Sequence, residues 1–297
     1  YGFITQIVGG MHIYGNIAQP FFIEHCIYAA FITITFSFLL AFYLESEAET
    51  YRVWLGILCL LFGIAIILTF VRAAWISVIF LLFFYLFQFR KKKNTVDLIL
   101  VLIVIFLVGI GMLFTTDLGT MLLQRLSTIT ETNYTANLDR IDRWVAAWRM
   151  WGDHPYLGVG WGAYPDQYFI YAPYKNENLL GFISAVPYSS AFRMGAHNIY
   201  LEILAEVGVV GLVIYLLMIY MFFRNMILLQ RQCLNKKFYR TFLIGCQGAM
   251  ITYLVHSFVN NLGPSDKISI TFWFLLGIIP TLEMLLRIEK SKENAEN

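Results

Sequence analysis

The sequence contains few charged residues. Lys, Arg, Asp and Glu make up 13% of the 297 residues, whereas 59% are hydrophobic. Soluble domains carry about a quarter charged residues, so this composition excludes an ordinary soluble globular protein. Several apolar runs are long enough to cross a bilayer. Together these features predict an all-α polytopic membrane protein with the lipid bilayer as its surroundings.

Two further absences exclude other classes. The formal net charge of +2 leaves no basic excess of the kind that nucleic-acid binding needs, so we expect no nucleic-acid partner. The four cysteines all fall outside the long polar segment 115–197, so we expect no structural disulfide. No secretion signal is visible, and the first residue is Tyr1. The simplest interpretation is that the chain is the C-terminal part of a longer protein with further helices upstream.

The apolar runs predict seven transmembrane helices, each about 17–25 residues long. The second and third follow one another with almost no connection, so they form a tight hairpin with Arg72 at its tip. The predicted spans are 25–44, 53–70, 73–89, 96–114, 199–223, 241–259 and 268–287.

The distribution of Lys and Arg predicts the orientation. Thirteen of the 21 basic residues lie in the connections on one side of the predicted helices. Eight lie on the other side, which holds Arg72 and the 115–197 segment. The richer side is expected in the cytoplasm. The domains are then 1–114 (N-terminal helices), 115–197 (a large external loop), 198–287 (C-terminal helices) and 288–297 (a cytoplasmic tail).

Residues 137–151 of the external loop predict an amphipathic helix. Apolar side chains, including Ile141, Trp144 and Trp148, recur at intervals of three or four, and Arg140 and Arg143 lie on a second face. Tryptophans together with arginines suit a helix at the lipid–water interface. The helix can be such an anchor and nothing more, or its arginines can also bind an anionic substrate.

The segment after this helix is rich in glycine. His154 and Pro155 precede the run Gly158-Val159-Gly160-Trp161-Gly162. Pro155 ends the helix and the glycines permit tight turns. Such a run can expose backbone N–H groups to a phosphate, although it follows no predicted strand, as a dinucleotide-binding motif would. Residues 163–195 are rich in Tyr, Phe, Ser and Asn, which suits either a sugar chain or an ordinary surface loop.

A polar segment meets a long apolar one at His197. Asn198, Glu202 and Glu206 recur every four residues and therefore form one stripe on a helix. Histidine titrates near neutrality, which suits a general base. The two carboxylates either orient His197 or form a buried structural pair, because carboxylates at membrane depth are usually paired. Gly208 and Gly211 are expected to permit close helix packing.

This stretch resembles the signature of the O-antigen ligase and polymerase superfamily. That signature is His-Asn, nine residues, Gly, two residues and Gly, and it fits His197-Asn198, Gly208 and Gly211. Further elements of the pattern are an Arg four residues before a Trp, the motif His-Pro-x-x-Gly-x-Gly, and an Arg hairpin in which Val71 replaces the usual Ser. They match Arg140, Trp144, His154, Pro155, Gly158, Gly160 and Arg72. The resemblance covers most of the chain from about residue 20 to 285.

The resemblance implies glycan transfer at the periplasmic face of a bacterial inner membrane. The donor would be a glycan on a polyprenyl diphosphate, and the acceptor a hydroxyl on lipid A–core, on another glycan or on a protein. We favour the ligase branch, because the His-Asn to Gly-Gly element is complete. A repeat-unit polymerase remains the alternative within the superfamily, and O-linked protein glycosyltransferases share the same elements. A membrane transporter and an inert scaffold are the alternatives from other classes.

The residue types suit this chemistry. His197 is the candidate base for the acceptor hydroxyl, and Asn198, Glu202, Glu206 and His154 are candidate supporting residues. A diphosphate leaving group needs cations, and arginine binds phosphate in a bidentate manner. Arg72, Arg140 and Arg143 are therefore the candidates. Acidic and histidine residues show no metal-ligand spacing in the loop, so we expect a metal-independent, cofactor-free transferase that inverts the anomeric carbon.

Overall fold

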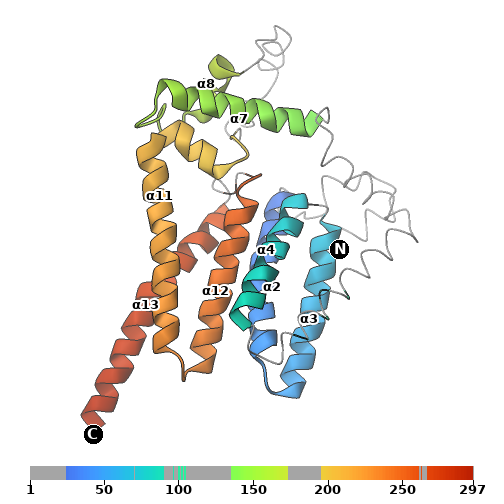
Figure 1. The fold of residues 1–297 in the computed structure, drawn as a ribbon, viewed down its shortest axis with the longest axis vertical. Coiled ribbons are helices and arrows are strands. Elements are labelled where there is room, and N and C mark those ends of the chain that lie inside the picture. The colour runs from blue at the N-terminus through green and yellow to red at the C-terminus, as the bar shows by residue number, and fades with distance from the viewer. Residues whose placement is uncertain are drawn as a thin grey trace. The chain divides into compact units, whose positions relative to one another are not determined.

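The computed structural model describes residues 25–69, 71–89, 96, 100, 102, 104, 135–172, 195–260, 262 and 266–296. Within these residues the structure consists of helices, without a strand. Five helices are long and apolar enough to cross a membrane, which confirms the all-α, multi-pass membrane class (Figure 1). These are α2 (His25–Glu45), α3 (Glu49–Leu68), α4 (Arg72–Phe89), α11 (Ile199–Gln232) and residues Lys267–Glu289 of α13 (Asp266–Glu296).

The predicted count of seven spans is not confirmed. The expected span 96–114 lies outside the described residues, apart from single positions. The expected span 241–259 corresponds to α12 (Lys237–His256), which ends three residues early. α12 is not among the five helices that are long and apolar enough to cross a membrane. Its sequence carries Lys237, Arg240, Gln247 and His256, and these lower its mean hydropathy.

The chain folds as two compact units. The first comprises residues 1–122, 221–256 and 265–297. α12 is its most buried helix, and every residue from Leu243 to Met250 is buried. The Ser37 hydroxyl of α2 donates to the Gly245 carbonyl at 3.0 Å, and the Tyr85 hydroxyl of α4 donates to the Ser37 carbonyl at 2.6 Å. Small residues on α12 let α2 and α4 approach closely, as is common between membrane helices.

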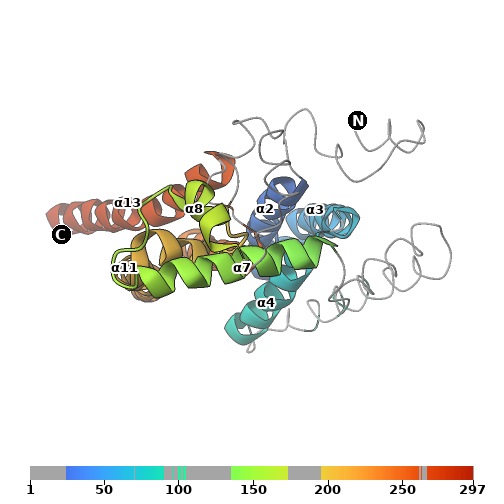
Figure 2. The same cartoon turned by 90° about the horizontal axis from the view of Figure 1, so that it is seen from above.

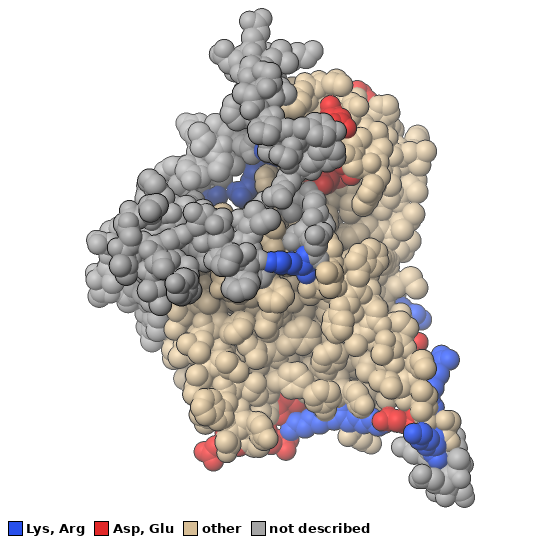
Figure 3. Space-filling model, turned by 180° about the vertical axis from the view of Figure 1, so that it is seen from behind, with Lys and Arg blue, Asp and Glu red and all other residues tan. Residues whose placement is uncertain are grey.

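Many charged residues of the first unit lie at the end where α2, α11 and α13 carry their C-terminal parts. The face drawn in Figure 3 has a broad band without Lys, Arg, Asp or Glu, and charged residues lie along its lower edge. Two ion pairs at this edge join the junction of α11 and α12 to the α2–α3 connection and to α13. Lys237 pairs with Glu47 at 2.5 Å, and Lys236 pairs with Glu289. These contacts put the α2–α3 connection, the α11–α12 connection and the later part of α13 on one side, as the alternating topology predicts.

The second unit comprises residues 123–220 and 257–264. It contains α7 (Thr135–Asp153), α8 (Tyr164–Tyr171) and the first part of α11. α7 confirms the helix predicted at 137–151. Within this unit, α7 runs across α11 in both views (Figure 1, Figure 2).

The packing of α7 differs from the expected one. Ile141 and Trp148 of the predicted apolar face are exposed, whereas Ala146, Ala147 and Met150 are fully buried. These small and flexible side chains pack in one cluster with Tyr164, Tyr168, Ala196 and Ala205. Alanines allow neighbouring backbones to approach closely, so the second unit buries the small-residue face. The periodicity of the large apolar residues did not indicate this choice.

Candidate functional site

His197 has a left-handed backbone conformation, with a φ of 51°. A non-glycine residue in this region costs about 1–3 kcal/mol, and such residues cluster at functional sites. The next residue, Asn198, is buried and caps α11. Its Oδ1 accepts the backbone N–H groups of Tyr200 at 3.0 Å and Leu201 at 3.1 Å. This cap satisfies two of the donors that every helix leaves unpaired at its N-terminus.

The residues on both sides of His197 are held by hydrogen bonds. Glu202 Oε2 accepts the Ala196 N–H at 2.7 Å, and the Ile199 N–H donates to the Ser257 carbonyl at 3.0 Å. Arg143 Nη1 donates to the Gly195 carbonyl at 3.1 Å. These contacts come from α11 itself, from the segment after α12 and from α7. They explain how the strained backbone at His197 persists.

Arg143 links three parts of the second unit. Besides its bond to Gly195, its guanidinium lies over the Tyr168 ring at 5.9 Å from the centroid. Its carbonyl accepts the Tyr164 hydroxyl at 2.8 Å. Arg140 precedes Arg143 by three residues on α7, so the two arginines share a face of the helix. The structure therefore brings Arg143 to the His197 segment, and Arg140 lies half-buried on the same side of α7.

α11 is broken at Gly208, where φ is 70° and ψ is −169°. The carboxylate of Glu206, two residues earlier, is buried and accepts the backbone N–H of Tyr164 at 3.0 Å. The predicted stripe of Asn198, Glu202 and Glu206 is therefore present, and a side-chain oxygen of each residue accepts a backbone N–H group. Glu202 thus holds the backbone next to His197, and the predicted roles of the two carboxylates stay predictions.

The loop after α7 fills the break in α11. In an unbroken helix, the N–H groups of Val209 and Val210 would donate to the carbonyls of Ala205 and Glu206. Here all four groups pair with the loop instead, and we call these paired segments (155–160 and 205–210) the kink–loop junction. The four bonds are Val159 N–H to Ala205 O (2.9 Å), Gly160 N–H to Glu206 O (3.0 Å), Val209 N–H to Pro155 O (2.9 Å) and Val210 N–H to Tyr156 O (3.3 Å).

Two glycines make the junction possible. A Cβ on Gly158 would lie 2.2 Å from the backbone carbon of Glu206, and a Cβ on Gly208 would lie 2.2 Å from the Tyr156 carbonyl oxygen. Both also have a positive φ, which favours glycine. Gly208 does permit a close approach, as predicted, but to the backbone of a loop. The glycine-rich run does not offer the N–H groups of Val159 and Gly160 to a phosphate, because α11 already accepts them.

The remaining predicted residues lie elsewhere. Arg72 begins α4 in the first unit. His154 is exposed near the end of α7, where its carbonyl accepts the Gly158 N–H at 3.0 Å. Among the described residues, no three His, Cys, Asp or Glu side chains are close enough to hold a metal ion. Metal independence stays a prediction.

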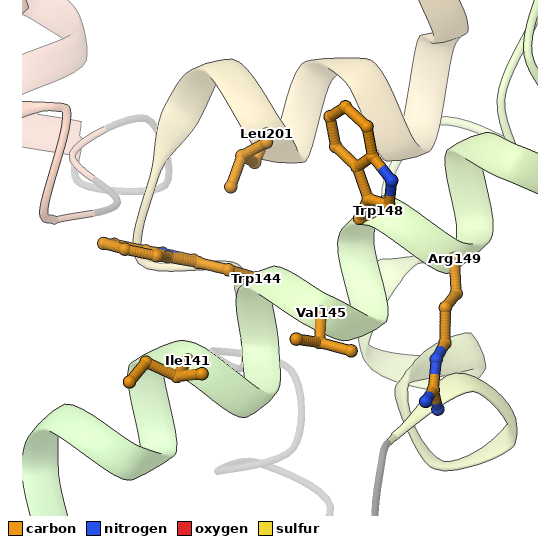
Figure 4. A pocket seen from close by; sticks show the side chains of 6 residues that line it. All are labelled: Ile141, Trp144, Val145, Trp148, Arg149 and Leu201. Atoms are coloured by element: carbon orange, nitrogen blue, oxygen red, sulfur yellow. The ribbon is translucent and has the colours of Figure 1, made fainter. Parts of the chain in front are cut away.

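An apolar groove of about 350 Å³ lies between α7 and the start of α11. Figure 4 shows Trp144, Val145 and Trp148 of α7 on one side and Leu201 of α11 opposite them. Ile141 and Arg149 complete the lining. The three-to-four-residue spacing of the tryptophans predicted that they share one face of α7. Nothing in the sequence indicated that Tyr164, Tyr168 and Gly195 take part in the site, because their contacts depend on the tertiary structure.

The geometry explains three sequence elements together: the His-Asn pair, the helix glycine at 208 and the His-Pro-x-x-Gly-x-Gly loop. No curated protein matches the chain at the level of significance required. The model of the O-antigen ligase family matches residues 56–216, which contain all three elements and more than half of the chain. The chain therefore belongs to the O-antigen ligase family.

Proposed function

We propose that this protein is a glycosyltransferase that moves a glycan from a polyprenyl-diphosphate carrier to an acceptor hydroxyl, in the manner of an O-antigen ligase. Family membership supports a role in membrane glycan biosynthesis. The location would be the bacterial inner membrane, with the reaction at the periplasmic face. The observation that carries the proposal is the left-handed backbone of His197, whose neighbours are held by hydrogen bonds to Glu202, Ser257 and Arg143.

In this proposal His197 acts as the general base. The imidazole accepts the proton of the acceptor hydroxyl as the hydroxyl oxygen attacks the anomeric carbon of the donor sugar. The new carbon–oxygen bond forms as the bond to the diphosphate breaks. The diphosphate leaves on its polyprenyl chain with the electron pair of that bond. A single displacement of this kind inverts the anomeric centre.

Arginines stabilise the leaving group in this proposal. The charge that develops on the diphosphate needs cations that stay protonated, and a guanidinium meets two phosphate oxygens with two parallel N–H groups. Arg143 donates one N–H to the Gly195 carbonyl, two residues before His197. An anion bound by Arg143 would therefore be held at a defined distance from the base. Arg140 and Arg72 are the further candidates for the diphosphate.

The second candidate is a repeat-unit polymerase of the same family, which would use the same base and the same cations. The two functions differ in the acceptor alcohol. The glycans of cells that lack the protein distinguish them. Long chains that remain on the polyprenyl carrier, with a bare surface acceptor, are expected for a ligase. Single repeat units without long chains are expected for a polymerase.

The proposed base is tested by complementing these cells with the wild type, with His197→Ala and with His197→Gln. We expect both variants to reach wild-type amounts in the membrane and to lower transfer by about 10²–10⁴-fold. Glycan transfer by His197→Ala at the wild-type rate would remove His197 from the mechanism. If deletion of the protein changes neither lipid-linked nor surface glycans, the transferase proposal fails for the main surface glycan.

A further inference from the structure

Three large apolar side chains project from the loop that fills the break in α11. Tyr156 is 71% exposed, Leu157 is 73% exposed and Trp161 is 82% exposed. The loop is not loosely attached, because the kink–loop junction ties its backbone to α11. A rigid, contiguous apolar patch on a protein surface marks a contact with lipid or with another molecule.

The patch continues the lipid-facing surface of α11. The N–H of Val209 bonds to the Pro155 carbonyl, and the N–H of Val210 bonds to the Tyr156 carbonyl. Both valines are exposed, as are Val213, Ile214 and Leu217 further along the same membrane-spanning helix. The exposed side chains of the loop therefore lie beside the first exposed turn of a helix whose outer surface contacts lipid.

The length of α11 predicts how deep this turn lies. The first basic residue after the kink is Arg224. The continuous spanning segment of α11 starts after the kink at Gly208. A hydrocarbon core of about 30 Å needs about 20 helical residues, so a core that begins at the kink ends about one helical turn after Arg224, and the Arg224 side chain reaches that boundary along its apolar stem. Val209 and Val210 then lie at or just inside the opposite boundary, and the bonded loop lies at the same depth.

The backbone of the loop is suited to this depth. Unpaired N–H and C=O groups are costly in hydrocarbon, so irregular backbone enters a membrane only where protein satisfies it. Five backbone donors and acceptors of the loop meet this condition, through α11 or through the preceding turn. They are the carbonyls of Pro155 and Tyr156 and the N–H groups of Gly158, Val159 and Gly160.

We infer that the 155–161 loop is inserted into the membrane, at the boundary between headgroups and acyl chains of the leaflet on the His197 side. Leu157 contacts acyl chains, and Tyr156 and Trp161 lie at headgroup level, where aromatic residues are enriched. The partner is the phospholipid of that leaflet. One consequence rests on the proposed function: a loop at this depth would keep the His197 segment near the level at which a lipid-linked diphosphate lies.

Spin-label accessibility of the full chain in phospholipid nanodiscs tests the insertion. Leu157→Cys and Trp161→Cys are made in a Cys26→Ala background, because the other three native cysteines are buried. Asp166→Cys, on the exposed surface of α8, is the matched control. We expect collisions with oxygen to exceed collisions with a water-soluble nickel chelate at position 157. The reverse is expected at position 166, and position 161 should be intermediate.

Two outcomes overturn the inference. Access of the nickel chelate to position 157 at the level of position 166 places the loop in water. Low collision rates with both reagents at 157 and 161 mean that a second copy or another protein covers the patch. All labelled sites are exposed side chains, so the variants are expected to fold, and their elution on size-exclusion chromatography checks this. The readout needs no glycan transfer, so its failure is distinct from failure of the proposed function.

Discussion

Each of the two compact units is stabilised internally by a different kind of interaction. In the first unit, α2, α4 and α12 meet through small residues and apolar surface, and the Ser37 and Tyr85 hydroxyls add two bonds. In the second unit, a broken helix and a loop exchange backbone hydrogen bonds, and buried Asn198 and Glu206 accept further N–H groups. The first arrangement depends on volume, whereas the second depends on the direction of each backbone group. Substitutions should therefore be tolerated differently in the two units.

The largest difference is expected at the glycines. Gly158→Ala and Gly208→Ala each place a Cβ within 2.2 Å of backbone atoms at a positive φ. The kink–loop junction cannot form with such an overlap, so we expect at least about 3 kcal/mol of destabilisation and complete loss of transfer. Thermal unfolding followed by fluorescence, together with a transfer assay, measures both effects.

Gly152→Ala is the matched control, because a Cβ there has no atom within 4 Å. It should leave transfer unchanged and raise stability by up to about 1 kcal/mol, because Gly152 lies within α7 and alanine favours a helix. Wild-type transfer by Gly158→Ala would contradict the junction as the element that shapes the site.

A second prediction separates stability from activity at His197. Glycine tolerates the left-handed conformation, so His197→Gly should unfold at a slightly higher temperature than His197→Ala, by about 1 kcal/mol in stability. Both variants lack the base, and transfer should fall by about 10²–10⁴-fold in each. A lower unfolding temperature for His197→Gly than for His197→Ala would mean that the backbone strain at position 197 is smaller than the entropy that glycine adds to the unfolded chain.

The third prediction concerns the arginines of α7. Arg140→Lys and Arg143→Lys should each lower transfer by about tenfold or more, because an ammonium group cannot bind a diphosphate with two parallel N–H groups. Arg149→Lys is the control on the same helix, since Arg149 is exposed and donates to the carbonyls of Tyr171 and Ala172. Equal rates for all three variants would argue against diphosphate binding by this face of α7.

The smallest effects sharpen the comparison of the two units. Glu202→Gln keeps an acceptor for the Ala196 N–H but removes its charge, so we expect a loss of about 1 kcal/mol and a several-fold slower transfer. Tyr85→Phe in the first unit removes the bond to the Ser37 carbonyl, with a similar loss of stability and an unchanged rate. A rate loss for Tyr85→Phe as large as that for Glu202→Gln would show that activity follows global stability.

Periodicity and composition determined much of this protein. The membrane class, the spans at α2, α3, α4 and α11 and the helix at 137–151 all follow from local patterns of apolar residues. The His-Asn pair and the glycine motifs were also visible in the sequence, as was the family that they resemble. Local patterns suffice here because a bilayer imposes one requirement on every spanning segment, which is a long apolar helix.

Only the tertiary structure decided how the motifs act together. Tyr164 and Glu206 are 42 residues apart, and nothing in this spacing predicts that the backbone N–H of Tyr164 donates to the carboxylate of Glu206. The same holds for the choice of the Ala146–Met150 face of α7 for burial and for the left-handed backbone at His197. These features arise from backbone groups that pair across distant segments. Such pairing depends on where the chain brings those segments together, and a periodic pattern of side chains does not encode it.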